Sequence, residues 1–474
     1  MEKEIQRILI ANRGEIVLRA IRTIAQMGKQ SIAIYSSADK DAHYLDTADA
    51  KVCVGGPKSA ESYLNIPAII SAAELFEADA IFPGYGFLSE NQNFVEICTH
   101  HGLEFIGPSA EVMALMGDKS KAKACMQQAG VPVIEGSNGT LKSYEEALEV
   151  AERIGFPIII KAANGGGGRG MRVVEKPSAL KNLYLAAETE ALSAFGDGSV
   201  YIEKFIENPK HIEVQILADK HGNVVHVGER DCSTQRRQQK LIEETPASVL
   251  KEEVRQRLLK TAINAAKHIG YVGAGTFEFL LDVNGQDFYF MEMNTRLQVE
   301  HTVSEMVSGL DLVEWMVRIA QGETLPSQES IRCQGHAIEC RITAEDPKTF
   351  TPSAGKITSW VAPGGMGVRF DTHAYADYKV PPYYDSMIGK LIVHAPTREQ
   401  AITKMKRALT ELHVEGIKTT RDFHLAMLDN PDFRHNKIHT KYLETQQRNL
   451  KCTQIESQEL PLHKPSPSPH WRRS

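Results

Sequence analysis

The chain has 474 residues, of which 42% are hydrophobic and 24% are charged, and its formal net charge is −6. Two to four domains are expected at this length, and the composition is that of an ordinary soluble globular protein. The acidic balance argues against a nucleic-acid-binding protein. No segment has the ~18 uninterrupted apolar residues of a membrane helix, and the apolar run near the start is too short for a signal peptide core.

Seven cysteines occur without a Cys-x-x-Cys pair. Free thiols in a reducing cytoplasm are the plain interpretation, and a cytoplasmic location is predicted. Cys232 lies between charged residues and is a candidate reactive thiol, although a spectator role is favoured.

The first elements predict a parallel sheet. Residues 7–13 indicate a strand and a turn, 14–28 a helix and 31–37 a second strand, which together make a βαβ start. The turn has one glycine, so it lacks the G-x-G-x-x-G pattern of a dinucleotide site. A later strand at 79–91 runs into a glycine-rich loop, where Tyr85 and Gly86 either line a cleft or only form a tight turn.

The next region predicts a phosphate-binding flap. A helix over 118–128 precedes a second helix, which opens with a capping box at Ser143–Glu146 and ends at Gly155. Lys161 ends a buried-looking strand, where a lysine is costly unless it meets an anion. Four glycines follow at 165–168 and suit a mobile flap with exposed N–H groups, a flexible linker being the alternative.

A hairpin across Asn284–Gly285 is predicted to place Glu278 and Glu292 on neighbouring strands. Two such carboxylates repel unless a cation intervenes, and Mg²⁺ is the usual hard-oxygen solution, with Asn294 as a further ligand. A salt-bridge network is the competing explanation. Polar residues alternate with apolar ones over 292–300, which predicts one extended strand whose polar face spans roughly 25 Å.

Further strands are expected from residue 335 on, in the segments HAIECRI, KITSWVA, GVRFDT and KLIVHAP, followed by a helix near 398–413. Residues after about 448 are polar and rich in proline and serine, which predicts a disordered tail.

Taken in order, these segments resemble the biotin carboxylase members of the ATP-grasp superfamily from residue 5 to about 447. The resemblance rests on the following motifs: IANRGEI (10–16), SYLNIPAII (62–70), PGYGFLSEN (83–91), LMGDK (115–119), GGGGRGMRVV (165–174), ERDCS and QRR (229–237), GAGTFEF (273–279), EMNTR and QVEH (292–301), AEDP (344–347) and PPYYDSMIGKLI (381–392).

The resemblance implies an α/β fold in three parts: an N-terminal Rossmann-like parallel-sheet domain over 1–114, an ATP-grasp domain over 115–330 with a mobile lid at about 132–204, and a C-terminal α+β domain over 335–447. It also implies ATP-dependent carboxylation of biotin with bicarbonate, through carboxyphosphate, as the first half-reaction of acetyl-CoA carboxylase in fatty acid synthesis. A subunit of a pyruvate or propionyl-CoA carboxylase is the alternative.

The resemblance also implies the site residues. ATP is expected to be bound by Lys119, Lys161, Gly167, Gly168, Glu203, Lys204, Phe205, Ile206, His211, Gln235, Glu278 and Glu292. Two Mg²⁺ or Mn²⁺ ions are expected on Glu278, Glu292 and Asn294. Bicarbonate is expected at Lys240, Arg296, Gln298, Val299 and Glu300, and biotin at Arg341 and Tyr85. Glu300 is the expected general base and Arg341 the group that stabilises the biotin enolate. Arg22 and Arg369 resemble dimer-interface positions.

Gln238 departs from the family pattern, which often has His at this place: a glutamine can still hydrogen-bond a ribose hydroxyl but cannot carry charge. No lysine hairpin that could carry biotin is present, which implies a separate biotin carboxyl carrier protein, and a carboxyltransferase partner is also implied. A carbamoyl-phosphate-type ligase and a silent nucleotide-binding regulator are the competing functions. The Arg341 and QVEH segments argue against the first, and the intact set Glu278, Glu292, Arg296 and Glu300 argues against the second.

Overall fold

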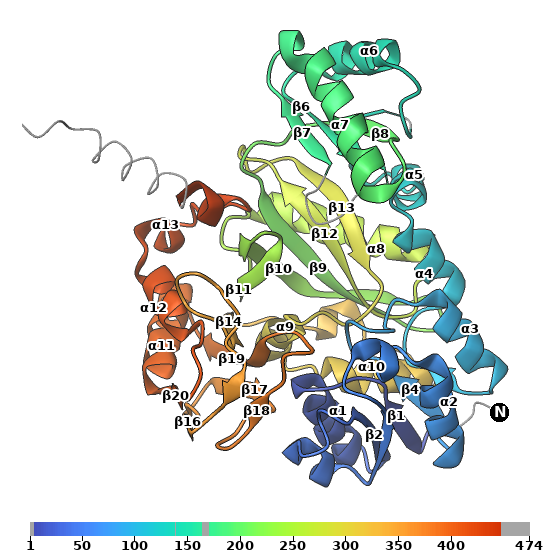
Figure 1. Ribbon diagram of the computed structural model, residues 1–474, viewed down its shortest axis with the longest axis vertical. Helices are drawn as coiled ribbons and strands as arrows, with labels where there is room; N and C mark the ends of the chain where they lie inside the picture. The colour runs from blue at the N-terminus through green and yellow to red at the C-terminus, as the bar shows by residue number, and fades with distance from the viewer. Residues whose placement is uncertain (1–3, 138, 164–169, 447–474) are drawn as a thin grey trace, which may run out of the picture.

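The computed structural model describes residues 4–137, 139–163 and 170–446. A parallel N-terminal sheet, a large central sheet and a small outlying sheet follow one another in space, and the last helices lie beside the central sheet (Figure 1). Within these described ranges, four short 3₁₀ helices lie between the longer elements: η1 His43–Thr47, η2 Ser59–Glu61, η3 Pro177–Ala179 and η4 Gln328–Ser330.

The N-terminal sheet is parallel, as predicted, with the strand order β3-β2-β1-β4-β5. Its strands are β1 Arg7–Ile10, β2 Gln30–Ser36, β3 Ala50–Gly55, β4 Ala80–Phe82 and β5 Glu104–Phe105. Helices α1 Glu15–Gln26, α2 Ile66–Leu75 and α3 Gln92–His100 connect them. The Asn65 and Asn91 side chains cap α2 and α3 by accepting from main-chain N–H groups in the first turn.

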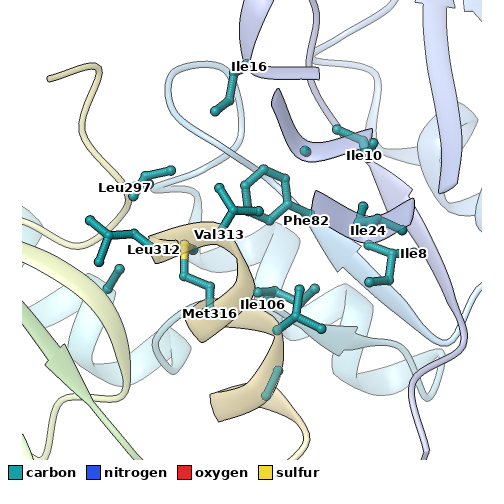
Figure 2. Close-up of a cluster of buried hydrophobic side chains, with 14 of the residues drawn as sticks. Ile8, Ile10, Ile16, Ile24, Phe82, Ile106, Leu297, Leu312, Val313 and Met316 are labelled. Atoms are coloured by element: carbon teal, nitrogen blue, oxygen red, sulfur yellow. The ribbon is translucent and has the colours of Figure 1, made fainter. Parts of the chain in front are cut away.

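A hydrophobic cluster joins this sheet to a distant part of the chain. Ile8, Ile10 and Phe82 from β1 and β4 are fully buried, and they pack with Leu312, Val313 and Met316 from helix α10 (Leu312–Ala320) (Figure 2). Burial of this apolar surface stabilises the attachment of the N-terminal sheet to the rest of the molecule.

The central sheet has eight antiparallel strands in the order β13-β12-β9-β10-β11-β14-β19-β17. The strands are β9 Lys210–Ala218, β10 Val224–Arg236, β11 Gln239–Thr245, β12 Gly273–Leu281, β13 Phe288–Asn294, β14 His336–Thr343, β17 Val368–Thr372 and β19 Met387–Ala395. Residues 336–395 therefore continue the sheet that residues 210–294 begin. The predicted hairpin of β12 and β13 is confirmed, with Gly285 at a positive φ of 65° in its turn.

Cross-strand register divides the central sheet into two faces, because paired residues point the same way. Residues Phe277, Phe279 and Val214 face helix α8 (Glu252–His268), and Ile338 and Cys340 face helix α11 (Arg398–Glu411). The opposite face carries polar side chains: His211, Glu213, Gln215, Arg230, Glu243, Glu278, Glu339 and Arg341. We call these eight residues the polar face.

The outlying sheet has three strands in the order β7-β6-β8, with β6 Ile158–Ala162, β7 Met171–Val174 and β8 Val200–Lys204. Helices α6 Tyr144–Ile154 and α7 Leu180–Phe195 share a hydrophobic cluster with these strands. The capping box of α6 forms in part: Ser143 Oγ accepts from the Glu146 N–H, whereas the Glu146 carboxylate accepts from the Lys142 N–H. Helices α4 Ala110–Gly117 and α5 Lys119–Gln128 lead from the N-terminal sheet toward this outlying sheet (Figure 1).

The remaining elements lie in the C-terminal part of the chain. The segment 356–362, predicted as one strand, is divided between β15 Gly355–Lys356 and β16 Ser359–Val361, which pair with β18 Lys379–Val380 and β20 His413–Glu415. Helices α12 Arg421–Asp429 and α13 Pro431–Arg434 follow, and residues 442–446 are again helical at the end of the described part of the chain. The predicted tail after residue 448 lies outside the described residues.

The prediction of one extended strand over 292–300 is wrong beyond Asn294, where β13 ends. Thr295 N–H bonds to the Glu90 carboxylate of a distant loop, and Leu297 is fully buried in the cluster with Leu312 (Figure 2). Glu300 is the N-cap of helix α9 (His301–Ser308). The alternation of polar and apolar residues therefore reflects an irregular segment that anchors Leu297 in the N-terminal core and turns its polar side chains toward the polar face.

Candidate active site

Glu278 and Glu292 lie directly opposite each other in β12 and β13, as predicted. Burial and the charge of Glu278 both raise the pKa of Glu292. Burial alone would also raise the pKa of Glu278, but Lys240 and His211 outweigh it and lower this pKa well below its usual range. The pKa values of the two carboxylates therefore shift in opposite directions, because the neighbouring cations outweigh burial at Glu278 but not at Glu292.

These residues fit a divalent cation. A cation between Glu278 and Glu292 would relieve the repulsion that raises the pKa of Glu292. Asn294 lies next to them: its amide nitrogen donates to Glu278 at 2.8 Å, and its amide oxygen accepts from Arg296 at 2.9 Å. Ligand atoms of His211, Glu213 and Glu278 also lie within 4.8 Å of one another, but Lys240 already donates to both carboxylates of that set.

Lys240 lies at the centre of the acidic groups. Its Nζ is 2.6 Å from Glu213, 2.9 Å from Glu278 and 2.5 Å from Glu300. Burial would lower the pKa of Lys240, but the three carboxylates raise it well above its usual range. Lys240 is therefore a fixed positive charge at neutral pH and not a base.

Glu300 is fully buried, and its second oxygen accepts from Arg341 at 3.0 Å. Burial would raise the pKa of Glu300, but Lys240, Arg341 and Arg230 lower it well below its usual range. Glu300 is therefore ionised and can accept a proton. Its proton affinity depends on how closely Lys240 and Arg341 approach it.

Two supporting residues, Arg230 and Glu213, were not predicted from the sequence. Arg230 is fully buried and donates to Glu213 at 2.5 Å, to Gln215 at 2.9 Å and to Ser304 at 2.9 Å. Glu213 in turn fixes Lys240. The available signal was the apolar strand at 211–217, where Glu213 and Gln215 occupy alternate positions and so share a face.

A second missed pair is Glu243 and Glu339, which lie directly opposite each other across β11 and β14. Both are fully buried. Burial raises the pKa of Glu243 to about 8, and the charge of Glu339 adds to this effect. Burial also raises the pKa of Glu339 to about 7, and there the charge of Glu300 adds to it. Arg341 donates to Glu243 at 2.6 Å, so Glu243 fixes Arg341 beside Glu300, whereas Thr302 donates to Glu339.

Arg296 lies in the irregular segment and donates hydrogen bonds to three neighbouring side chains. It donates to Glu90 at 2.9 Å, to Gln298 at 3.1 Å and to Asn294 at 2.9 Å. The amide nitrogen of Gln298 donates to Glu278 at 2.9 Å. Arg296 and Gln298 are thus joined to Glu278 and Asn294, although no single strand aligns them.

Tyr85 and Val299 both contact Lys390. The fully buried Lys390 donates to the Val299 carbonyl at 2.8 Å, and its ammonium lies 5.5 Å from the centre of the Tyr85 ring. Lys390 pairs with Arg341 in the register of β14 and β19, so Tyr85 and Arg341 approach the same end of the site. Asn12 fixes the Tyr85 loop by donating to the Pro83 and Tyr85 carbonyls.

The remaining predicted nucleotide residues lie toward the outlying sheet. Lys161 meets an anion, as predicted: it donates to Glu203 at 2.6 Å. Lys119 is exposed at the start of α5 and contributes to the electrostatic environment of Glu292. Gly167 and Gly168 lie outside the described residues.

The segment 204–206 begins at Lys204, the last residue of β8. Lys204 donates to the carbonyls of Gly155 and Phe156, and the Phe205 N–H donates to Pro157. The Phe205 N–H is therefore engaged within the protein, and Ile206 is partly buried beside it. His211 Nε2 lies 3.1 Å from Glu278, and the Gln235 amide lies 3.3 Å from His211 Nδ1.

Three further predicted positions lie away from this cluster. Gln238 is exposed in the turn between β10 and β11, where it and Arg237 both have positive φ angles. Arg22 is exposed on α1, and Arg369 is held by Glu305 and Asp371.

Cys232 is fully buried, and burial raises the pKa of its thiol, which supports the spectator role.

Three protein families match the chain in succession: the N-terminal domain of biotin carboxylase over residues 4–113, the ATP-binding domain of the carbamoyl-phosphate synthase L chain over 118–328, and the C-terminal domain of biotin carboxylase over 339–445. The order of domains and the acidic site beneath the outlying sheet define an ATP-grasp carboxylase.

Named relatives share most of this sequence. A biotin carboxylase of Nostoc sp. is 56% identical over 92% of this chain and 98% of that protein. Biotin carboxylase 1 of Bacillus subtilis is 51% identical over 93% of this chain and 98% of that protein. The chain belongs to the biotin carboxylase family and is an ATP-dependent biotin carboxylase.

Solved structures agree with this assignment. A biotin carboxylase from Campylobacter jejuni, in a β,γ-ATP complex, is 66% identical, with a TM-score of 0.88 over 93% of this chain and 99% of that chain. The biotin carboxylase domain dimer of Hydrogenobacter thermophilus 2-oxoglutarate carboxylase, solved with MgADP, ADP and bicarbonate, is 47% identical, with a TM-score of 0.86 over 94% of this chain and 98% of that chain. Within the described part of this chain, no helix is both long and apolar enough to cross a membrane.

Proposed function

We propose that the polar face and the irregular segment 295–300 together form the site where ATP, divalent cations and bicarbonate meet. Glu278, Glu292 and Asn294 hold the cations. Lys119, Lys161, His211 and Gln235, with the segment 203–206 and Gly167 and Gly168, bind the nucleotide. Lys240, Arg296, Gln298, Val299 and Glu300 bind bicarbonate, and Arg341 and Tyr85 meet biotin.

One observation carries this proposal: Lys240 donates both to Glu278, on the nucleotide side, and to Glu300, on the bicarbonate side. A single fixed cation therefore joins the two half-sites. Such a charge can offset negative charge that develops while a phosphoryl group moves to bicarbonate, without any rearrangement at the moment of reaction.

Glu300 is the group that takes the proton of bicarbonate as bicarbonate attacks the γ-phosphate. Burial would raise the pKa of Glu300, but Lys240, Arg341 and Arg230 outweigh burial and lower it. The carboxylate is therefore ionised and can accept a proton. When bicarbonate binds, its negative charge shares Lys240 and Arg341 with Glu300, so the pKa of Glu300 rises and it becomes a better proton acceptor. Carboxyphosphate breaks down to CO₂ and phosphate, and the phosphate takes the ureido N–H proton of biotin. Arg341 stabilises the resulting enolate, which captures the CO₂.

Divalent cations bound at Glu278, Glu292 and Asn294 supply charge compensation for the phosphates. Neighbouring side chains orient the Glu278 carboxylate, because Asn294 and Gln298 both donate hydrogen bonds to it. The segment 132–204 serves as a lid, which excludes water from the labile intermediate.

The wider setting follows from the same function. Biotin arrives on a separate carrier protein, and carboxyltransferase subunits consume the carboxylated carrier in an acetyl-CoA carboxylase of the cytoplasm. Arg22 and Arg369 lie at the interface of a homodimer. Pyruvate or propionyl-CoA is the alternative final acceptor.

The test is an ADP-release assay with free biotin, run with and without bicarbonate. ADP release that needs both compounds supports the proposed function. Release that ignores biotin would indicate a different acyl-phosphate ligase, and no release under any condition would indicate a nucleotide-binding regulator.

A further inference from the structure

Glu203 is shared by two lysines. Its Oε2 lies 2.6 Å from Lys161 of β6, and its Oε1 lies 2.7 Å from Lys123 of α5. The side chain of Glu203 is 10% exposed, and those of Lys161 and Lys123 are 26% and 28% exposed. Lys123 comes from the helix that precedes the outlying sheet, so this contact joins two different parts of the molecule.

The charges of these three groups depend on one another. Burial would raise the pKa of Glu203, but Lys161 and Lys123 lower it. A buried carboxylate that loses its only cationic partner is strongly destabilised. If Lys161 were the sole partner, moving its ammonium onto a nucleotide would leave Glu203 uncompensated, and this cost would weaken nucleotide binding.

We propose that Lys123 is a positioning residue of the nucleotide site: it keeps Glu203 neutralised so that the Lys161 ammonium is free to exchange from Glu203 to an adenine nucleotide. The inference rests on the proposed nucleotide role of Lys161. Lys123 lies four residues after Lys119 on α5, so the two side chains share one face of the helix. Lys121, between them, is 71% exposed and pairs only with the helix cap Asp118 among the described residues.

The experiment compares Lys123→Met with the control Lys121→Met in the full chain, measuring MgADP affinity by calorimetry and the KM and kcat for ATP. Lys123→Met is expected to weaken ADP binding and raise the KM for ATP by about tenfold, the effect of one lost charged hydrogen bond. The kcat at saturating ATP should change by less than about twofold. Lys123→Arg keeps the charge and should restore the affinity to within about threefold of wild type, because the exchange needs a cation and not a particular shape.

A double-mutant cycle separates charge exchange from a simple tether between α5 and the outlying sheet. In a Lys161→Met background, Lys123→Met should add less than about twofold, because no ammonium remains to be released. A further full tenfold loss there would overturn the exchange role. So would wild-type affinity in Lys123→Met. If thermal unfolding shows that Lys123→Met does not fold, Lys123→Gln, which is also neutral and should show the same loss, replaces it. A wild-type protein that binds no ADP would instead contradict the proposed function.

Discussion

Lys240 Nζ lies 2.5 Å from Oε1 of Glu300, and this contact holds the carboxylate ionised inside the protein. The distance fits a strong charge-assisted hydrogen bond. Because the same ammonium also donates to Glu213 and Glu278, a change at Glu300 should alter the chemistry at one half-site and leave nucleotide binding at the other largely intact.

Glu300→Gln removes the proposed base and preserves the size of the side chain. Bicarbonate-dependent ATP cleavage should fall by about 100-fold or more, as expected for the loss of a general base, while MgADP affinity stays within about threefold. Steady-state ADP release and calorimetry measure the two effects. Glu253→Gln, at an exposed position of α8, is the matched control. Undiminished turnover in Glu300→Gln would contradict the assigned role.

Glu292→Gln tests the electrostatic conflict with Glu278. Burial and the Glu278 charge raise the pKa of Glu292, so the neutral variant should be the more stable protein without divalent cations, by about 2 °C in unfolding temperature. It should also lose most of the extra stabilisation that Mg²⁺ adds to ADP. Thermal scans in EDTA and in MgADP check both effects. A variant that responds to MgADP like wild type would exclude Glu292 as a metal ligand.

Glu243→Gln should change how stability depends on pH. Burial raises the pKa of Glu243 from 4.5 to about 8 in the folded protein. A raised pKa contributes stability that is fully present below about pH 4.5 and is lost as the pH rises through about 8. Relative to wild type, the variant should therefore gain unfolding temperature as the pH increases from 6 to 9. A difference that stays constant over this range would show that Glu243 is ionised throughout.

The opposite dependence of stability on pH is expected for Glu244, which lies on the other face of β11. It accepts from Arg398 at 2.6 Å and from His336 at 2.8 Å. Burial would raise its pKa, but these partners lower it to about 2. Its contribution to stability is therefore present above about pH 4.5 and lost as the pH falls through about 2.

Glu244→Gln should accordingly destabilise the protein at pH 7 by about 3 kcal/mol, as for a broken buried ion pair, and by roughly half as much or less near pH 3. Denaturant unfolding at the two pH values gives the comparison. Equal losses at both would mean that the amide disrupts packing and not charge.

The sequence predicted the hairpin, the opposed Glu278 and Glu292, and the anion that Lys161 meets, because each depends on local periodicity or on the cost of burying one charge. It did not predict that the chain leaves the sheet after Asn294. A strand and an irregular segment can share the same alternation, and here the burial of Leu297 against the N-terminal core decides between them.

The supporting residues were missed for a different reason. Glu213, Arg230, Glu243 and Glu339 lie on four different strands and become a connected group only through cross-strand register, which brings distant parts of the chain onto one face. Lys123 is similar: its spacing on α5 gives no sign of Glu203, which lies 80 residues away in sequence. Such contacts are set by tertiary pairing and not by any local pattern.

The most direct test of the account is a crystal grown with Mn²⁺, ADP and bicarbonate, with anomalous scattering used to locate the metal. The account predicts Mn²⁺ between Glu278 and Glu292, and bicarbonate against Arg296 and Lys240 within hydrogen-bonding distance of Glu300. Manganese bound away from the glutamate pair, or bicarbonate bound away from Lys240, would contradict it.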